Sequence, residues 1–301
     1  MDQPAAAQSN GRRALVAAWL GWAFDGLDSY LFIGVAIPLV KRLSAAADPA
    51  LASLPDKALT DLATTRAAWI QAAFFIGWAL GGAVFGRIGD RIGRTKVLSL
   101  TILTYALFTG LGFFATEWWH LLIFRFLAAL GIGGEWAAGS ALVCETLHAR
   151  HKAWASALLQ SGYILGIIAA TLTGGLFKTP GQEQYVFLMG ILPALCVLWI
   201  RRFVHEPPAW KNAAAGQRVP RVGELFAPGV RHVTLLVGAF VSLSLVAAWV
   251  FIFFTPQVVR LLAAAEPGRS KADAQQIVTY VSLAYFGVNL AANFVATYLA
   301  K

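Results

Sequence analysis

The sequence predicts an all-α membrane protein built as a helical bundle, and its composition and its long apolar runs lead to that fold class. Hydrophobic residues make up 58% of the 301 residues, only 13% are charged, and the mean hydropathy is +0.64. A soluble protein of this length needs more polar surface than that. Long apolar runs also recur between shorter polar segments. A chain that crosses a membrane repeatedly in such runs must close its backbone hydrogen bonds internally, as helices do.

Eight apolar runs are long enough to cross a bilayer as helices, which takes about 20 residues each. They cover residues 14–40, 67–86, 97–116, 118–143, 153–177, 185–203, 232–256 and 275–300. The first run has the small residues of a signal-peptide cleavage site behind it, but it is too long and carries two aspartates. We therefore expect it to stay as the first membrane helix.

Short hydrophilic loops join most of the runs, and two connections are longer. Residues 41–66 form the first, and residues 204–231, which contain four prolines, form the second. The second connection is the natural boundary of a six-helix unit. We predict a six-helix half at 1–203, a linker at 204–231 and part of a second half at 232–301.

The charge pattern gives an orientation and excludes several classes of protein. The net charge is +9, yet no long basic run suggests nucleic-acid binding. With a cytoplasmic N-terminus, the cytoplasmic segments hold nearly twice as many lysines and arginines as the opposite ones, which is the usual bias. Cys144 and Cys196 lie in apolar runs and match no disulfide framework or metal-site spacing. We expect no cofactor and no metal.

The loop between the second and third runs reads "GRIGDRIGRTK", from Gly86 to Lys96. A tight cytoplasmic hairpin made basic by the orientation rule would explain its arginines. It would not explain the glycines around Asp90 and Arg91, which permit a close reversal of the chain. Asp90 is placed to cap a helix start or to meet a neighbouring helix N-terminus.

This pattern resembles the signature loop of the major facilitator superfamily. Five residues match it: Gly86, Asp90, Arg91, Gly93 and Arg94. Thr95 departs from the pattern, because a second basic residue is common there. In that family the loop joins helices two and three and helps to latch one conformation, so the resemblance implies the same role here.

Other stretches resemble particular helices of the same superfamily. They are "RFLAALGIGGEWAAGSALVCETL" from Arg125, "ALLQSGYILG" from Ala157 and "HEPPAW" from His205. Together with "FDGLD", they look most like the bacterial proton symporters of sialate, lactate and other metabolites. The resemblance implies twelve helices in two halves around a substrate cavity. This sequence supplies one half and two further helices, so we expect a C-terminally truncated chain.

Asp25 and Asp28 stand in the middle of the first apolar run and share one helix face. Charged residues at membrane depth usually face a bundle interior or a wet cavity. At about 1.5 Å per residue, Asp28 lies about 22 Å in from Arg13, and Arg125 lies about 10 Å in from the opposite side. The two are level in a hydrocarbon core about 30 Å thick. We therefore expect Asp28 to pair with Arg125.

The role of this pair has two interpretations. A static ion pair would fix one helix against the other. Alternatively, burial and a nearby guanidinium have opposite effects on the proton affinity of a carboxylate, which can poise it to titrate. Proton arrival would then release Arg125 to take a substrate carboxylate through two hydrogen bonds. Asp25 either shares this coupling role or forms hydrogen bonds between helices while protonated.

Other polar residues in the apolar runs have a structural and a functional interpretation each. Glu135 suits a gate or a packing ion pair better than a substrate contact. Gln160 and Tyr163 line a cavity or bond neighbouring helices. Asn289 and Asn293 share an inward helix face and contact substrate or pack helices.

The residues and the resemblance together predict a secondary transporter and not an enzyme. We expect a proton symporter of a small organic anion, such as a monocarboxylate, that works by alternating access. Its partners are the substrate, protons and the lipid bilayer, with no nucleic acid. The location is the bacterial inner membrane, with the N-terminus cytoplasmic. The alternatives are a sugar-like or zwitterionic solute porter of the same fold, or a non-transporting truncated remnant.

Overall fold

A computed structural model of the chain describes residues 5–173, 181–207, 210, 222–265 and 270–299. The chain divides into two compact units, and each is described by itself. The first unit comprises residues 1–215 together with 286–301, and the second comprises residues 216–285. The predicted division into 1–203, 204–231 and 232–301 stays a prediction.

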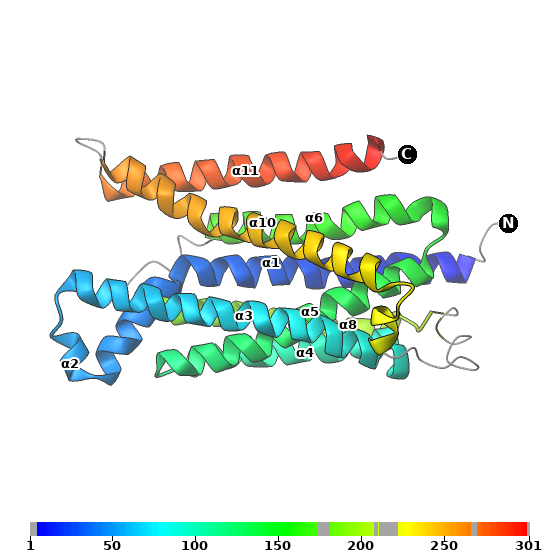
Figure 1. Cartoon of the computed structure of the whole chain (residues 1–301), viewed down its shortest axis with the longest axis horizontal. Coiled ribbons are helices and arrows are strands. Elements are labelled where there is room, and N and C mark those ends of the chain that lie inside the picture. The colour runs from blue at the N-terminus through cyan, green and yellow to red at the C-terminus, as the bar shows by residue number, and fades with distance from the viewer. Residues whose placement is uncertain (1–4, 174–180, 208–209, 211–221, 266–269, 300–301) are drawn as a thin grey trace. The chain divides into compact units, whose positions relative to one another are not determined.

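Helices make up nearly all of the described chain (Figure 1). The long ones are α1 (Ala5–Ala47), α3 (Asp56–Ile92), α4 (Arg94–Leu111), α5 (Trp118–Thr146), α6 (Ala149–Thr173), α8 (Leu192–Phe203), α10 (Arg231–Ala265) and α11 (Lys271–Leu299). The short ones are α2 (Pro49–Ala52), α7 (Val186–Met189) and the 3₁₀ turns η1 (Gly112–Phe114), η3 (Glu183–Tyr185) and η4 (Val222–Phe226).

Eight of the helical segments in the described residues are long and apolar enough to cross a membrane. This number and the all-helical architecture confirm the predicted fold class. The prediction of a long polar connection at 41–66 was wrong in its structure, because α1 runs on to Ala47 and α3 begins at Asp56. Between them the carboxylate of Asp48 accepts a hydrogen bond from the Ala50 backbone N–H and caps α2.

Helix α5 is central to the first unit, where it packs along α3, α4 and α1, and α1 packs in turn along α6. Glycines make the closest of these contacts. A Cβ atom on Gly133 would lie 2.0 Å from the Trp78 carbonyl oxygen, and one on Gly81 would lie 2.1 Å from the Leu130 carbonyl oxygen. Small residues allow helix backbones to approach in membranes. Glycines therefore bring the backbones of α3 and α5 close together.

Two clusters of buried apolar side chains form the core of the first unit. One contains Ala14 and Ala17 of α1 with parts of α3, α4, α5 and α8, and the other contains α1 from Leu31 to Leu43 with Ile70, Leu121 and Phe187. The segment of α1 between the two clusters carries Asp25 and Asp28. The buried charges therefore lie between two apolar layers.

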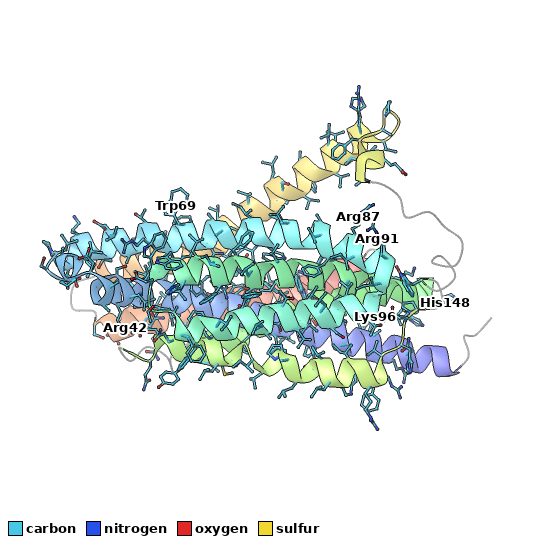
Figure 2. The ribbon with its side chains drawn as sticks, turned by 90° about the horizontal axis from the view of Figure 1, so that it is seen from below. Arg42, Trp69, Arg87, Arg91, Lys96 and His148 are labelled. Atoms are coloured by element: carbon cyan, nitrogen blue, oxygen red, sulfur yellow. The ribbon has the colours of Figure 1, made fainter. Side chains whose placement is uncertain are left out.

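The outer surface of the first unit is apolar along the helices and basic at its ends. Trp69 points outward from α3 and is 63% exposed, which suits a side chain that faces lipid (Figure 2). Arg87, Arg91, Lys96 and His148 gather at one end, and Arg42 lies at the opposite end (Figure 2). We call the first of these the loop end, because the Gly86–Lys96 loop lies there.

The second unit contains η4, α10 and the first half of α11. The Thr234 hydroxyl at the start of α10 donates a hydrogen bond to the Leu225 carbonyl of η4 at 2.8 Å. The rings of Phe251 on α10 and Tyr285 on α11 lie 5.1 Å apart. These contacts join the elements of this unit to one another.

Candidate functional site

Asp28 of α1 and Arg125 of α5 form a buried ion pair in the first unit. Nη1 of Arg125 donates to Oδ2 of Asp28 at 2.6 Å. Arg125 is 1% exposed and Asp28 is 7% exposed. The structure thus brings together the two residues that the sequence predicts to lie level in the membrane.

Two aromatic rings hold the guanidinium of Arg125 in addition to the carboxylate. Its central carbon lies 4.4 Å from the ring centroid of Phe32 and 4.6 Å from that of Phe74. A cation over an aromatic face is attracted by the ring quadrupole, and more strongly when water is excluded. Nε of Arg125 has no hydrogen-bond partner among the described residues. The guanidinium therefore keeps a donor free for another acceptor.

Asp25 and Glu135 lie in the same interior, on α1 and α5. Asp25 is fully buried and Glu135 is 2% exposed, and all four carboxylate oxygens lack a hydrogen-bond partner among the described residues. The charges of Glu135 and Asp28 both act on Asp25. The structure gives Glu135 no ion-pair partner among the described residues, so the packing ion pair considered for it is not formed there.

Gly21 makes the room that the Glu135 side chain occupies. A Cβ atom on Gly21 would lie 1.6 Å from Oε1 of Glu135, which no side chain could tolerate without displacing the carboxylate. Beside Glu135 is a small recess of about 10 Å³, room for about one water molecule. Its lining comes from α1, α5 and α6: Ala18, Trp22, Glu135, Trp136, Gly139, Ser140 and Leu159. Glu135 therefore borders a space that can hold a water molecule.

Trp22 is the centre of an aromatic group around the recess. Its ring lies 4.9 Å from Tyr163, 6.3 Å from Trp78 and 6.3 Å from Trp136, between ring centroids. Its indole N–H donates to Oε1 of Gln160 at 3.3 Å. Gln160 and Tyr163 of α6 therefore contact Trp22 of α1 and fix these helices together.

Asn293 bonds a neighbouring helix. Its Nδ2 donates to the Ala157 carbonyl oxygen at 2.7 Å, within the first unit. This is the helix-packing alternative of the two considered for it. Asn289, one turn earlier on α11, is partly buried.

The signature loop is built around Gly93 and Arg94. Gly93 has φ +114°, a backbone conformation that favours glycine, and it separates α3 from α4. Arg94 bridges two carboxylates, Asp90 at 2.8 Å and Glu145 of α5 at 2.9 Å. Gly86 lies within α3, where a Cβ would meet only Ala137 at 3.6 Å, and Arg91 is exposed. Glu145 thereby joins the loop to α5.

Of the two roles considered for Asp90, a cap on the next helix is not formed, because Glu206 takes that position. Its Oε1 accepts from the backbone N–H groups of Thr95 and Lys96 at 3.1 and 3.2 Å. A carboxylate satisfies otherwise unpaired N–H groups at a helix start. Gly93 leaves space for it, since a Cβ there would lie 2.4 Å from Oε1 of Glu206. In the sequence, Glu206 stood out only as part of the "HEPPAW" stretch, which did not indicate the groups that it would bind.

Comparison with known families decides the relationship of this chain. A profile described as the Major Facilitator Superfamily matches residues 18–301. The chain belongs to the Major Facilitator Superfamily. The predictions of the family, of an integral membrane protein and of a non-enzymatic function are therefore confirmed at the level of the superfamily.

Two curated superfamily members show how much of a relative the chain spans. It is 34% identical over 200 residues to the sialic acid transporter NanX of Escherichia coli, covering 66% of this chain and 45% of that protein. It is 36% identical over 188 residues to the niacin transporter NiaP of Acinetobacter baylyi, covering 62% of this chain and 39% of that protein. The chain thus spans less than half the length of these relatives.

A solved structure of the superfamily has the same fold. The proton:xylose symporter XylE aligns with a TM-score of 0.73 at 17% identity, covering 96% of this chain and 69% of that one. At this identity the likeness concerns the fold alone. It agrees with the helical bundle of the first unit.

Proposed function

We propose that this superfamily member works, in its complete protein, as a proton symporter of a small organic anion. The observation that carries the proposal is the buried pair of Asp28 and Arg125. Two opposite charges in a low-dielectric interior are stable together, and removing one charge costs several kcal/mol, about 3–5. Protonation of Asp28 removes its negative charge. Arg125 is then left without an anionic partner, and the anionic substrate takes the place of Asp28.

The chemistry of Arg125 favours a carboxylate as this substrate. A guanidinium is planar and can give a carboxylate two parallel hydrogen bonds. Nε of Arg125 lacks a partner among the described residues, and release of Asp28 frees Nη1. The relatives named for sialic acid and niacin act on molecules that each carry a carboxyl group. These points support an organic acid over a neutral sugar-like solute.

Alternating access requires contacts at one end of the bundle that form and break. At the loop end, Arg94 joins Asp90 of α3 to Glu145 of α5, and Glu206 holds the start of α4. We assign to these contacts the latch of one conformation. Because the ions are partly exposed, the latch is weak enough to open during a cycle.

The location proposed for the protein is the bacterial inner membrane with the loop end in the cytoplasm. The excess of lysine and arginine on the segments of that end supports this orientation. Lys57 belongs to the opposite end. A membrane-impermeant thiol reagent added to intact cells should label Lys57→Cys and leave Lys96→Cys unlabelled; the reverse pattern contradicts the orientation.

Transport by the complete gene product in proteoliposomes tests the function. With an acidic exterior, radiolabelled nicotinate or sialic acid should accumulate above its external concentration, and a protonophore should abolish the accumulation. Labelled xylose, a neutral control, should not accumulate. Binding of both acids without accumulation would contradict a transporter, and accumulation that a protonophore leaves unchanged would contradict proton coupling.

A further inference from the structure

We propose that Asp25 and Glu135 form a second proton-binding site, a carboxylate pair that carries the proton between Asp28 and the recess at the loop end. The proposal rests on the proposed proton symport for its purpose. It adds to that function an internal path with named residues. Its own test requires no transport.

The two carboxylates lie between α1 and α5 and continue the path from Asp28. Asp25 shares a helix face with Asp28 at a spacing of three residues, and Gly21, against which the Glu135 carboxylate packs, lies one turn before Asp25 on the same helix. Asp25 is thus the intermediate position. A proton can move along these three groups directly or through a water molecule between them.

Burial without partners makes an ionised pair costly. None of the four oxygens accepts a hydrogen bond from the described residues. An ionised carboxylate taken out of water without a partner costs several kcal/mol, and two like charges add their repulsion. One shared proton removes a charge and lets the acid donate a hydrogen bond to its neighbour. The pair is therefore built to hold a proton.

The groups that face the pair supply no free cation. Besides Asp28, the ionisable side chains in this interior are Tyr105 of α4, Arg125 of α5, Tyr163 of α6 and Cys196 of α8. Arg125 is bonded to Asp28. From α3, the rings of Trp78 and Phe85 close the same interior. Neither Asp25 nor Glu135 forms an ion pair with a cation among the described residues.

Tyr105 is placed to support the proton transfer. Its hydroxyl is fully buried and lacks a hydrogen-bond partner among the described residues. The charges of Glu135 and Asp25 both act on it. A phenolic O–H both donates and accepts, so it can stabilise whichever carboxylate is ionised. Tyr105, Asp25 and Glu135 are thus three buried polar groups without a hydrogen-bond partner among the described residues.

The recess supplies the exit of the path. Glu135 lines it together with Ala18, Gly139 and Ser140, which lie on the loop-end side of Asp25 along α1 and α5. Glu135 first gives the shared proton of the pair to water in the recess. The Asp28 O–H bond then breaks as its proton binds Asp25, which restores the Asp28–Arg125 ion pair and leaves one proton on the Asp25–Glu135 pair.

Infrared spectroscopy of the complete, purified, substrate-free protein tests the pair. A carboxylic-acid C=O band should be present at neutral pH, and Asp25→Asn and Glu135→Gln should each change it. Each substitution should also move the titration midpoint of the remaining carboxyl by about one pH unit or more, as expected for coupled groups. Glu183→Gln is the matched control, since Glu183 is buried but bonded to Arg42 at 3.2 Å. It should leave band and midpoint unchanged.

Two results would overturn the proposal. One is a titrating band that both substitutions leave unchanged, and the other is a band that only Asp28→Asn removes. Circular dichroism of each variant checks that its helices are formed, and should Glu135→Gln fail to fold, Gly21→Ala displaces the same carboxylate. Since no substrate is involved, failure here leaves the proposed symport standing. Conversely, if proton-driven accumulation is not found, the infrared titration still reports whether Asp25 and Glu135 share a proton.

Discussion

Arg125 combines an ion pair with two aromatic contacts in the interior of the first unit. It bonds Asp28, lies between the rings of Phe32 and Phe74, and is 1% exposed. Such a setting excludes water from the guanidinium and strengthens every electrostatic contact it makes. The same contacts also fix the orientation of the planar guanidinium group. The geometry of Arg125, and not its charge alone, should therefore govern anion binding.

Arg125→Lys tests this point, because lysine keeps the charge and loses the planar fork. Loss of one hydrogen bond to a charged group costs about 1.5–3 kcal/mol, which corresponds to a rise of about 10- to 100-fold in the KM for nicotinate or sialic acid uptake. Arg66→Lys is a control, since Arg66 also lies over an aromatic ring, that of Trp118. Equal KM values for the two variants would contradict the role of the fork.

At the same scale, the sequence predicted some contacts and missed others. Asp28 and Arg125 could be paired because both are charged in apolar runs and lie at similar depth. The proximity of Asp25 to Glu135 could not be predicted, since it depends on the rotation of α1 against α5 and on the gap at Gly21. Glu206 was missed because its partners are backbone N–H groups, which carry no sequence signal.

At the scale of elements, α3 and α5 form one of the closest helix contacts in the first unit. Gly81 of α3 and Gly133 of α5 each lie against the backbone of the other helix. Contact at this distance leaves no space for a methyl group, so the two helices hold one register. Asp28 and Arg125 meet only if α5 also keeps its place beside α1.

A pair of neighbouring glycines makes this packing testable. Gly133→Ala places a Cβ 2.0 Å from the Trp78 carbonyl oxygen, whereas Gly82→Ala places one 3.5 Å from the Gly133 carbonyl oxygen. Overpacking costs about 1–3 kcal/mol, so Gly133→Ala should lower the thermal unfolding midpoint of the purified protein. Gly82→Ala should not lower it, because alanine favours helix. Equal midpoints would refute the tight contact.

Helix positions were predicted well and helix ends poorly, for a physical reason. Apolar length marks the part of a helix that lies in hydrocarbon, and all eight runs coincide with helices long enough to cross a membrane. The segments beyond the hydrocarbon are polar and carry no such mark. Residues 41–47 and 56–66 therefore resembled a loop, although they extend α1 and α3.

At the scale of the whole molecule, the buried charges of the first unit lie along α1 and α5. Apolar clusters lie on either side of Asp25, Asp28 and Arg125, whereas Glu135 lies alongside the α5 residues of one cluster. We propose that a proton crossing this unit uses these groups or water beside them. The complete protein is proposed to couple that movement to the anion, and this chain spans less than half the length of its curated relatives NanX and NiaP.

The central claim is that Asp28 carries the coupled proton, and substrate-driven proton movement tests it most directly. Nicotinate or sialic acid, whichever the wild type accumulates, is added to de-energised vesicles containing the complete protein while the external pH is followed. The wild type and the exposed control Asp61→Asn should make the medium more alkaline as protons enter with the anion. Asp28→Asn should give no alkalinisation, because asparagine binds no proton. Alkalinisation of wild-type size in Asp28→Asn would contradict the account.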